Sequence, residues 1–310
     1  MTADPHATGA GPWGPYRLQV ALGGAGLAAS VLVLAAGVRA VHVQPAAARR
    51  TDVAGLTFTY PTVNAAAAVL MALALLGAVV LLVTVFGAVR QVRDHRRLTR
   101  ALPVTGALPG HPSVLVVAAD APMAFCAGWL RPRVYVSTAV LARLSPGELG
   151  AVLAHEHHHG ALRDPLRLAI GRVLCTALFF LPVLRPLQAR ESEAAELRAD
   201  AAAVDAVAAA PLASALLMLG ATADGVVGVS PDRVDQLLGQ APAWRPPWLL
   251  LTFAFATLAG LVTLLWRVSG SASIAATLSI SSQPCVLVLA LVPVVAGLAG
   301  CISTTTRSTI

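Results

Sequence analysis

Lysine is absent from this chain of 310 residues, and only 12% of the residues are charged. Soluble domains carry about 25% charged residues. The hydrophobic fraction is 57%, and the mean hydropathy is +0.74. This composition excludes an ordinary soluble domain and predicts a membrane protein.

The net charge of +7 is carried by arginine. Direct binding to nucleic acid is not expected, because basic and aromatic residues do not interleave and no nucleic-acid motif is recognisable. In a membrane protein, such arginines more often face anionic lipid on the cytoplasmic side. A lipid bilayer is therefore the first expected partner.

Cysteine and glutamate are also scarce. The four cysteines form no CxxC pair, so a disulfide framework is not expected. The five glutamates all lie between positions 148 and 196. Any chemistry that needs a glutamate is therefore confined to this part of the chain.

Four apolar stretches are long enough to cross a bilayer, which takes about 20 residues. They cover about 18–38, 64–89, 247–266 and 284–301. Five arginines follow the second stretch directly, at positions 90, 93, 96, 97 and 100. By the positive-inside rule, this side of the membrane is cytoplasmic.

The predicted architecture is mainly α-helical and polytopic, with an α+β domain on the cytoplasmic face. Tails cover 1–17 and 303–310, pairs of transmembrane helices cover 18–89 and 247–302, and the cytoplasmic domain covers 90–246. A fifth apolar stretch, 166–184, contains Arg167 and Arg172 and leaves too few uncharged residues to span. We expect a buried or membrane-leaning helix of the cytoplasmic domain there.

Local patterns indicate strands and helices within this domain. β-branched runs predict strands at 113–118 and 133–137, with a weaker one at 123–129. The run from Ser145 to Glu148 has the N-cap, first-turn proline and third-position glutamate of a helix start. The alanine-rich segment 191–210 is expected to be helical, and 224–245 is expected to be a polar connector.

The stretch from His155 to His159 reads His-Glu-His-His-His and fits the H-E-x-x-H pattern. On a helix, His155 and His159 share one face and can hold one metal ion, while Glu156 can take a proton from a water that the metal activates. His157 and His158 point away from that face. We expect them to be surface or substrate-rim residues.

A third metal ligand must come from elsewhere, because a catalytic zinc usually has three protein ligands and a water. Glu196 is the best candidate, since a glutamate on a second helix can complete a His₂Glu site. Asp200 follows one turn later and could hold the free ring nitrogen of a ligand histidine. Glu191 and Glu193 remain alternatives, although neither has an aspartate four residues on.

Four segments together resemble the BlaR/MecR-type membrane metallopeptidases, and they are also similar to HtpX-like membrane peptidases and zinc CAAX prenyl proteases. They are 121–137, 144–159, Arg163-Asp164 and 196–200. The resemblance covers roughly 110–210. It implies a gluzincin-like endopeptidase domain that holds one Zn²⁺.

The resemblance also implies a role for each matching residue. The zinc ligands would be His155, His159 and Glu196, with Glu156 as the general base. Asp200 would hydrogen-bond the ring nitrogen of a ligand histidine that does not face the zinc. Asp164 matches a family position as well, and we expect it to cap a helix or to pair with Arg163 or Arg198.

The segment 122–129 resembles the edge strand on which such peptidases lay their substrates. Ala124, Phe125 and Cys126 are the expected substrate-binding residues, because an extended peptide can add a strand to a sheet edge. An ordinary core strand is the alternative interpretation. Since the chain has no lysine, it cannot carry the S-x-x-K and K-T-G motifs of the penicillin-sensing relatives.

Three functions are open at this point. The first is a zinc endopeptidase that cleaves a regulator at the cytoplasmic face, by analogy a BlaI/MecI-like winged-helix repressor. The second is an HtpX-like protease for quality control of membrane proteins. The third is a metal-binding signalling protein without catalysis. The short spacing between the histidines and Glu196 favours the BlaR/MecR-like arrangement, because it leaves no room for two spans.

Overall fold

The computed structural model describes residues 14–43, 49–53, 56–60, 62–220, 230–237, 239, 244–272 and 274–276. The chain divides into two compact units. One contains 1–20, 88–175 and 182–247, and the other contains 21–87, 176–181 and 248–310. We call them the site unit and the apolar unit.

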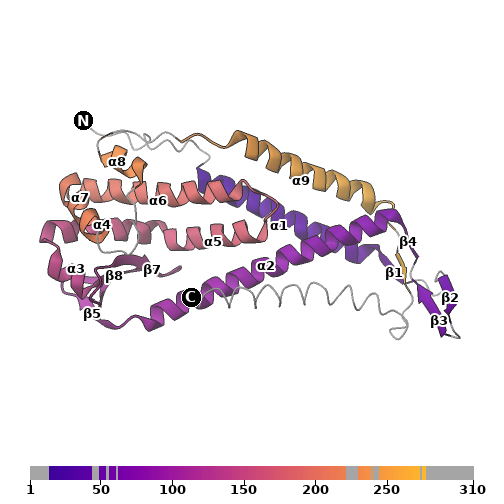
Figure 1. Ribbon diagram of the computed structural model, residues 1–310, viewed down its shortest axis with the longest axis horizontal. Helices are drawn as coiled ribbons and strands as arrows, with labels where there is room; N and C mark the ends of the chain where they lie inside the picture. Colours follow the sequence, from indigo (N-terminus) through magenta and orange to yellow (C-terminus); the bar gives the residue numbers. More distant parts are fainter. Residues whose placement is uncertain are drawn as a thin grey trace. The chain divides into compact units, whose positions relative to one another are not determined.

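The apolar unit is built around helices α1 (Pro15–Ala40), α2 (Ala65–Ala101) and α9 (Trp248–Ser269). All three are long and apolar enough to cross a membrane by length and composition. They correspond to the first three predicted spans, and α2 continues past the predicted end at 89 through the arginine cluster (Figure 1). The fourth predicted span, 284–301, lies outside the described residues.

Short strands accompany these helices. β1 (Val41–Val43) pairs with β9 (Ile274–Ala276), which also pairs with β4 (Thr62–Val63). A separate hairpin joins β2 (Arg49–Val53) to β3 (Leu56–Tyr60).

The site unit contains one four-stranded sheet. Its strands are β5 (Val104–Leu108), β6 (His111–Val117), β7 (Ala124–Ala127) and β8 (Arg133–Ser137), in the spatial order β5-β6-β8-β7. Only β6 and β8 run parallel. Three of the strands lie at the predicted places, and β8 has the predicted bounds. β5 was not predicted.

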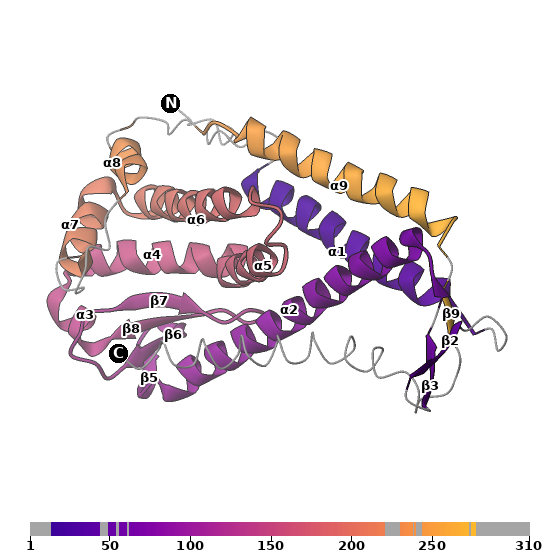
Figure 2. The ribbon, with the colours of Figure 1, turned by 45° about the vertical axis from the view of Figure 1, so that its right-hand side comes forward.

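The part of α2 from Ala88 onward belongs to this unit. So do six further helices among the described residues: α3 (Thr138–Arg143), α4 (Pro146–Leu162), most of α5 (Asp164–Ala177), α6 (Leu184–Ala206), α7 (Ala209–Gly220) and α8 (Pro231–Leu237). Helix α4 lies between the sheet and α6 (Figure 2). Its Leu153 packs on Val114 of β6 and on Val134 and Val136 of β8, which are nearly inaccessible to solvent. Apolar contact with the sheet therefore fixes one face of α4.

The predicted start of α4 is confirmed. Ser145 accepts a hydrogen bond from the Glu148 N–H at 3.4 Å, and its own N–H donates to the Glu148 carboxylate at 2.8 Å. This reciprocal pair satisfies two backbone donors that a helix start would otherwise leave open.

Three sequence-based boundaries were wrong. The helix expected over 166–184 ends at Ala177, and the chain turns before α6 begins at Leu184. The helix expected over 191–210 therefore starts two turns earlier, and it ends at Ala206 before α7. The connector 224–245 contains α8, which begins at Pro231, a residue suited to the first helical position.

The turn between β7 and β8 depends on Gly128. Its φ is +118°, and a Cβ there would lie 2.5 Å from the carbonyl oxygen of Arg131. We expect Gly128→Ala to lower the free energy of unfolding by about 1–3 kcal/mol, because strain of this kind costs that much. Chemical denaturation measures this.

Gly147→Ala is the matched control. Gly147 lies in the first turn of α4, and its Cβ would meet nothing closer than 4.0 Å. This variant should be as stable as the wild type or more stable, because alanine favours a helix. Equal stability of both variants would show that the turn does not require glycine.

Candidate metal centre

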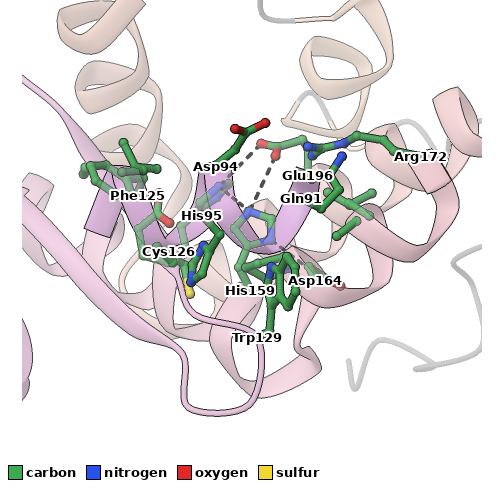
Figure 3. A pocket seen from close by; sticks show the side chains of 18 residues that line it. Gln91, Asp94, His95, Phe125, Cys126, Trp129, His159, Asp164, Arg172 and Glu196 are labelled. Carbon is green, nitrogen blue, oxygen red and sulfur yellow. Dashed lines mark hydrogen bonds and ion pairs between the residues drawn. The ribbon is translucent and has the colours of Figure 1, made fainter. Parts of the chain in front are cut away.

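Two histidines and one glutamate converge in the site unit. His155 and His159 lie one turn apart on α4, and their Nε2 atoms are 3.1 Å apart. Glu196 of α6 faces both, with its carboxylate oxygens 3.5 Å from each Nε2. One ligand atom from each residue lies within 4.8 Å of the others, as Figure 3 shows for the labelled His159 and Glu196.

A carboxylate lies behind each histidine ring. The Nδ1 atom of His155 is 3.0 Å from Asp200 Oδ1, and the Nδ1 atom of His159 is 2.9 Å from Asp164 Oδ2. A carboxylate at Nδ1 favours a proton on that nitrogen and leaves Nε2 with its lone pair. Both Nε2 lone pairs are thereby directed at the same point beside Glu196.

This donor set fits a divalent cation. Two neutral imidazole nitrogens and one carboxylate oxygen are the ligands of many catalytic zinc sites. Burial opposes charge on His155, yet the carboxylates of Asp200 and Glu196 raise the pKa of that imidazole to about 9. These carboxylates therefore stabilise positive charge at the site, and a metal ion that binds there would replace the second proton of this imidazole.

Glu156 lies beside this cluster but is not one of its three donors. Its side chain is buried, and burial raises the pKa of its carboxyl group. Glu196 raises this pKa further, whereas the two histidines and a backbone hydrogen bond from Cys126 lower it. A carboxylate with a raised pKa is suited to accepting and returning a proton.

Arg233 of α8 is a site residue that the sequence interpretation missed. Its guanidinium donates two hydrogen bonds to Asp200, at 2.6 and 2.7 Å, and lies 3.3 Å from Glu196. Asp200 is fully buried, and this two-pronged contact offsets the cost of burying its charge. Arg233 falls in the segment expected to be a connector, where no pattern pointed to the metal.

Asp164 pairs with Arg198, one of the two arginines expected, but its closer partner is Arg167. Arg167 lies 3.2 Å away and Arg198 lies 3.8 Å away, while Arg163 forms the left-handed C-cap of α4. Burial raises the pKa of Asp164, but His159 and these arginines lower it below its usual range. Asp164 therefore stays ionised behind His159.

The alternative third ligands point elsewhere. Glu191 is buried between Arg167 and Arg198, at 2.8 and 3.0 Å. Glu193 pairs with Arg190 at 2.6 Å. Neither belongs to the cluster of donor atoms found among the described residues.

His157 and His158 are not in the cluster either. The ring of His157 reaches the carbonyl of Leu153 at 2.7 Å and the hydroxyl of Ser113 at 3.1 Å. It therefore contacts the start of β6, away from the metal ligands.

A cavity of about 700 Å³ opens over the three donors (Figure 3). The expected substrate residues Ala124, Phe125 and Cys126 line one wall from β7. The lining also includes one face of α2: Gln91, Asp94, His95 and Leu98. Their spacing of three and four residues is that of one helical face, and the sequence interpretation noticed only the arginines between them.

Comparison with known proteins agrees with this geometry. Residues 89–221 match the model of peptidase family M48. A segment of 89 residues is 37% identical to Protease HtpX homolog 2 of Methanosarcina mazei, covering 28% of this chain and 30% of that protein. The chain thus matches less than a third of the length of this curated relative. No solved structure matches the chain.

The matched part of the chain is therefore similar to metallopeptidases of family M48 and to an HtpX-like protease. The three long apolar helices agree with a membrane protein. The matched residues include all of the donors and Glu156.

Removing Arg233 should weaken metal binding. In Arg233→Met, Asp200 loses its two-pronged partner and no longer fixes the ring of His155. We expect zinc affinity to fall about 10- to 100-fold, as it does when such supporting groups are lost. Competition with a chromophoric chelator measures this.

Arg190→Met is the matched control. Arg190 also joins α6 to α8, through Asp232 at 2.7 Å, but touches none of the donors. Its zinc affinity should stay within about twofold of the wild type, since it holds no supporting group. If both variants lose affinity equally, the effect belongs to the docking of α8 and not to Asp200.

Proposed function

We propose that this protein is a zinc endopeptidase of the membrane that hydrolyses peptide bonds at the cytoplasmic face. The observation that carries the proposal is the convergence of His155, His159 and Glu196 beside a buried Glu156. A buried carboxylate beside the donors that is not itself one of them favours catalysis over a metal site without catalysis, because a peptidase needs a proton acceptor at this position.

Each side chain has a defined task in this proposal. His155, His159 and Glu196 hold Zn²⁺, which when bound lowers the pKa of a water to about 7 and polarises a carbonyl. Glu156 takes the proton of the attacking water and returns it to the leaving amine. Asp200 and Asp164 keep the two imidazoles turned so that Nε2 faces the cation.

The substrate would lie along β7, the edge strand of the sheet. The Ser137 N–H donates to the Met123 carbonyl, so alternate residues of β7 bond to β8. Ala124 and Cys126 then turn their backbone groups toward the uncovered edge. An extended peptide can pair there in a way that tolerates many sequences.

Cys126 links this strand to the general base. Its backbone hydrogen bond reaches Glu156, and burial raises the pKa of its thiol to about 12, with Glu156 and Asp164 adding to the effect. The Cys126 thiol is therefore protonated near neutral pH in the absence of a metal. Ala124 is left as the β7 residue whose N–H is best placed to pair with a substrate.

Two substrate classes remain candidates. The similarity to Protease HtpX homolog 2 favours a protease that acts on membrane proteins. The direct passage from α5 to α6, with only the turn 178–183 between them, favours a BlaR/MecR-like peptidase that cleaves a winged-helix repressor. Digestion of purified proteins of each kind distinguishes them.

Glu156→Gln should abolish peptidase activity and keep zinc, because the amide cannot accept the proton while the three ligands are intact. We expect activity to fall by at least about 100-fold. Glu196→Gln should lose both activity and zinc. Zinc content by atomic emission and cleavage of casein by the purified protein measure the two properties.

Glu193→Gln is the control for Glu196→Gln, because it lies on the same helix and pairs with Arg190. It should keep both zinc and activity. An active Glu156→Gln variant would refute the assigned base, and a Glu196→Gln variant with full zinc would refute the third ligand.

Ala124→Pro should weaken substrate binding without affecting zinc. Proline removes the edge-facing N–H of Ala124, which, unlike that of Cys126, is not bonded to Glu156, and edge strands tolerate proline on that side. The loss of one hydrogen bond predicts a fall in kcat/KM of roughly 2- to 13-fold, read from the hydrolysis of a quenched fluorescent peptide. Unchanged kcat/KM at full zinc content would argue that β7 is an ordinary core strand.

A further inference from the structure

The first turns of α1 belong to the site unit. Tyr16 lies under Arg167 of α5, with the guanidinium carbon 4.4 Å from the centre of the ring. This is the distance of a cation–π contact. Arg167 is three-quarters buried, so the contact is shielded from water.

Arg167 also contacts two carboxylates on the side of the metal donors. Its Nη1 lies 3.2 Å from Asp164 and its Nη2 lies 2.8 Å from Glu191. Asp164 in turn holds Nδ1 of His159 at 2.9 Å. A continuous series of contacts therefore runs from the ring of Tyr16 to a proposed metal ligand.

A second contact fixes the register of α1 on the same helices. Gln19 is fully buried, and its amide nitrogen donates to the Gln188 side chain at 2.9 Å and to the carbonyl of Gly171 at 3.4 Å. Any Cβ at position 171 would collide with the amide of Gln188. A buried amide is costly unless its partners are in place, so α1 cannot slide or rotate here without losing them.

We propose that the N-terminal turn of α1 positions the metal site, with Tyr16 acting on His159 through Arg167 and Asp164. The proposal rests on the metal site of the proposed function and goes beyond it. Helix α1 is long and apolar enough to span a membrane. A displacement of α1 at its N-terminal turn would reach a zinc ligand through three contacts.

The physical basis is the orientation of Arg167. The ring of Tyr16 covers one face of the guanidinium and leaves its edge for the two carboxylates. Without the ring, the guanidinium of Arg167 gains freedom, and the Asp164 carboxylate is held less firmly by its closer arginine partner. The ring of His159 is then held less firmly, and the site loses part of its preorganisation for the cation.

The test uses the full-length protein in detergent and Co²⁺ as a spectroscopic substitute for zinc. Tyr16→Ala should weaken Co²⁺ binding about three- to tenfold, the range of a partly buried cation–π contact. The visible absorption band of bound Co²⁺ should also shift. Tyr16→Phe keeps the ring face and should match the wild type in both.

A double-mutant cycle separates positioning from general destabilisation. In Asp164→Asn, the path from Arg167 to His159 is already weakened. Tyr16→Ala should therefore have little further effect on Co²⁺ affinity in that background, because coupled residues give non-additive changes. Additive losses, or a Tyr16→Ala variant with wild-type affinity and spectrum, would overturn the proposal.

The same measurements distinguish a failure of this proposal from a failure of the proposed metal site. In the latter case the wild-type protein binds no Co²⁺ at the site, and Glu196→Gln changes nothing. If the wild type binds Co²⁺ and loses it in Glu196→Gln while Tyr16→Ala is silent, only the role of Tyr16 is refuted.

Discussion

The arrangement of the site depends on the carboxylates that lie behind the two histidines of α4. Asp200 and Asp164 hold the Nδ1 atoms, and this leaves both Nε2 atoms facing Glu196. Burying two carboxylates is costly unless each is paired. Arg233 offsets that cost for Asp200, and Arg167 does so for Asp164. Helices α5, α6 and α8 are thus required for a motif that lies on α4 alone.

The sheet contributes the other half of the site. Valines of β6 and β8 pack against Leu153 of α4. The edge strand β7 lines the cavity that contains the donors. The backbone of Cys126 reaches Glu156 from this strand. The strand proposed to hold the substrate is therefore in direct contact with the residue proposed to move the proton. Gly128 follows β7 directly, and its positive φ is required for the turn that leads into β8.

Much of the site could be predicted from sequence because its signals are local. The spacing of His155 and His159, the cap at Ser145 and the position of Asp200 relative to Glu196 all follow from helical periodicity. Arg233 and the cavity face of α2 could not be predicted, because their roles arise from tertiary packing between distant segments. The break after Ala177 was missed for a different reason: an apolar run is compatible with one helix or with a helix and a turn. The spans, the orientation and the substrate stay predictions.

The ligand set is the central claim, and X-ray absorption at the zinc edge tests it most directly. The account predicts about one zinc per chain with only nitrogen and oxygen neighbours at about 2.0–2.2 Å. The outer-shell scattering should correspond to two imidazoles, and one of the oxygen neighbours should be absent in Glu196→Ala. A sulfur neighbour at about 2.3 Å would place Cys126 or another thiol on the metal. That result, or a protein that retains no zinc, would contradict the account.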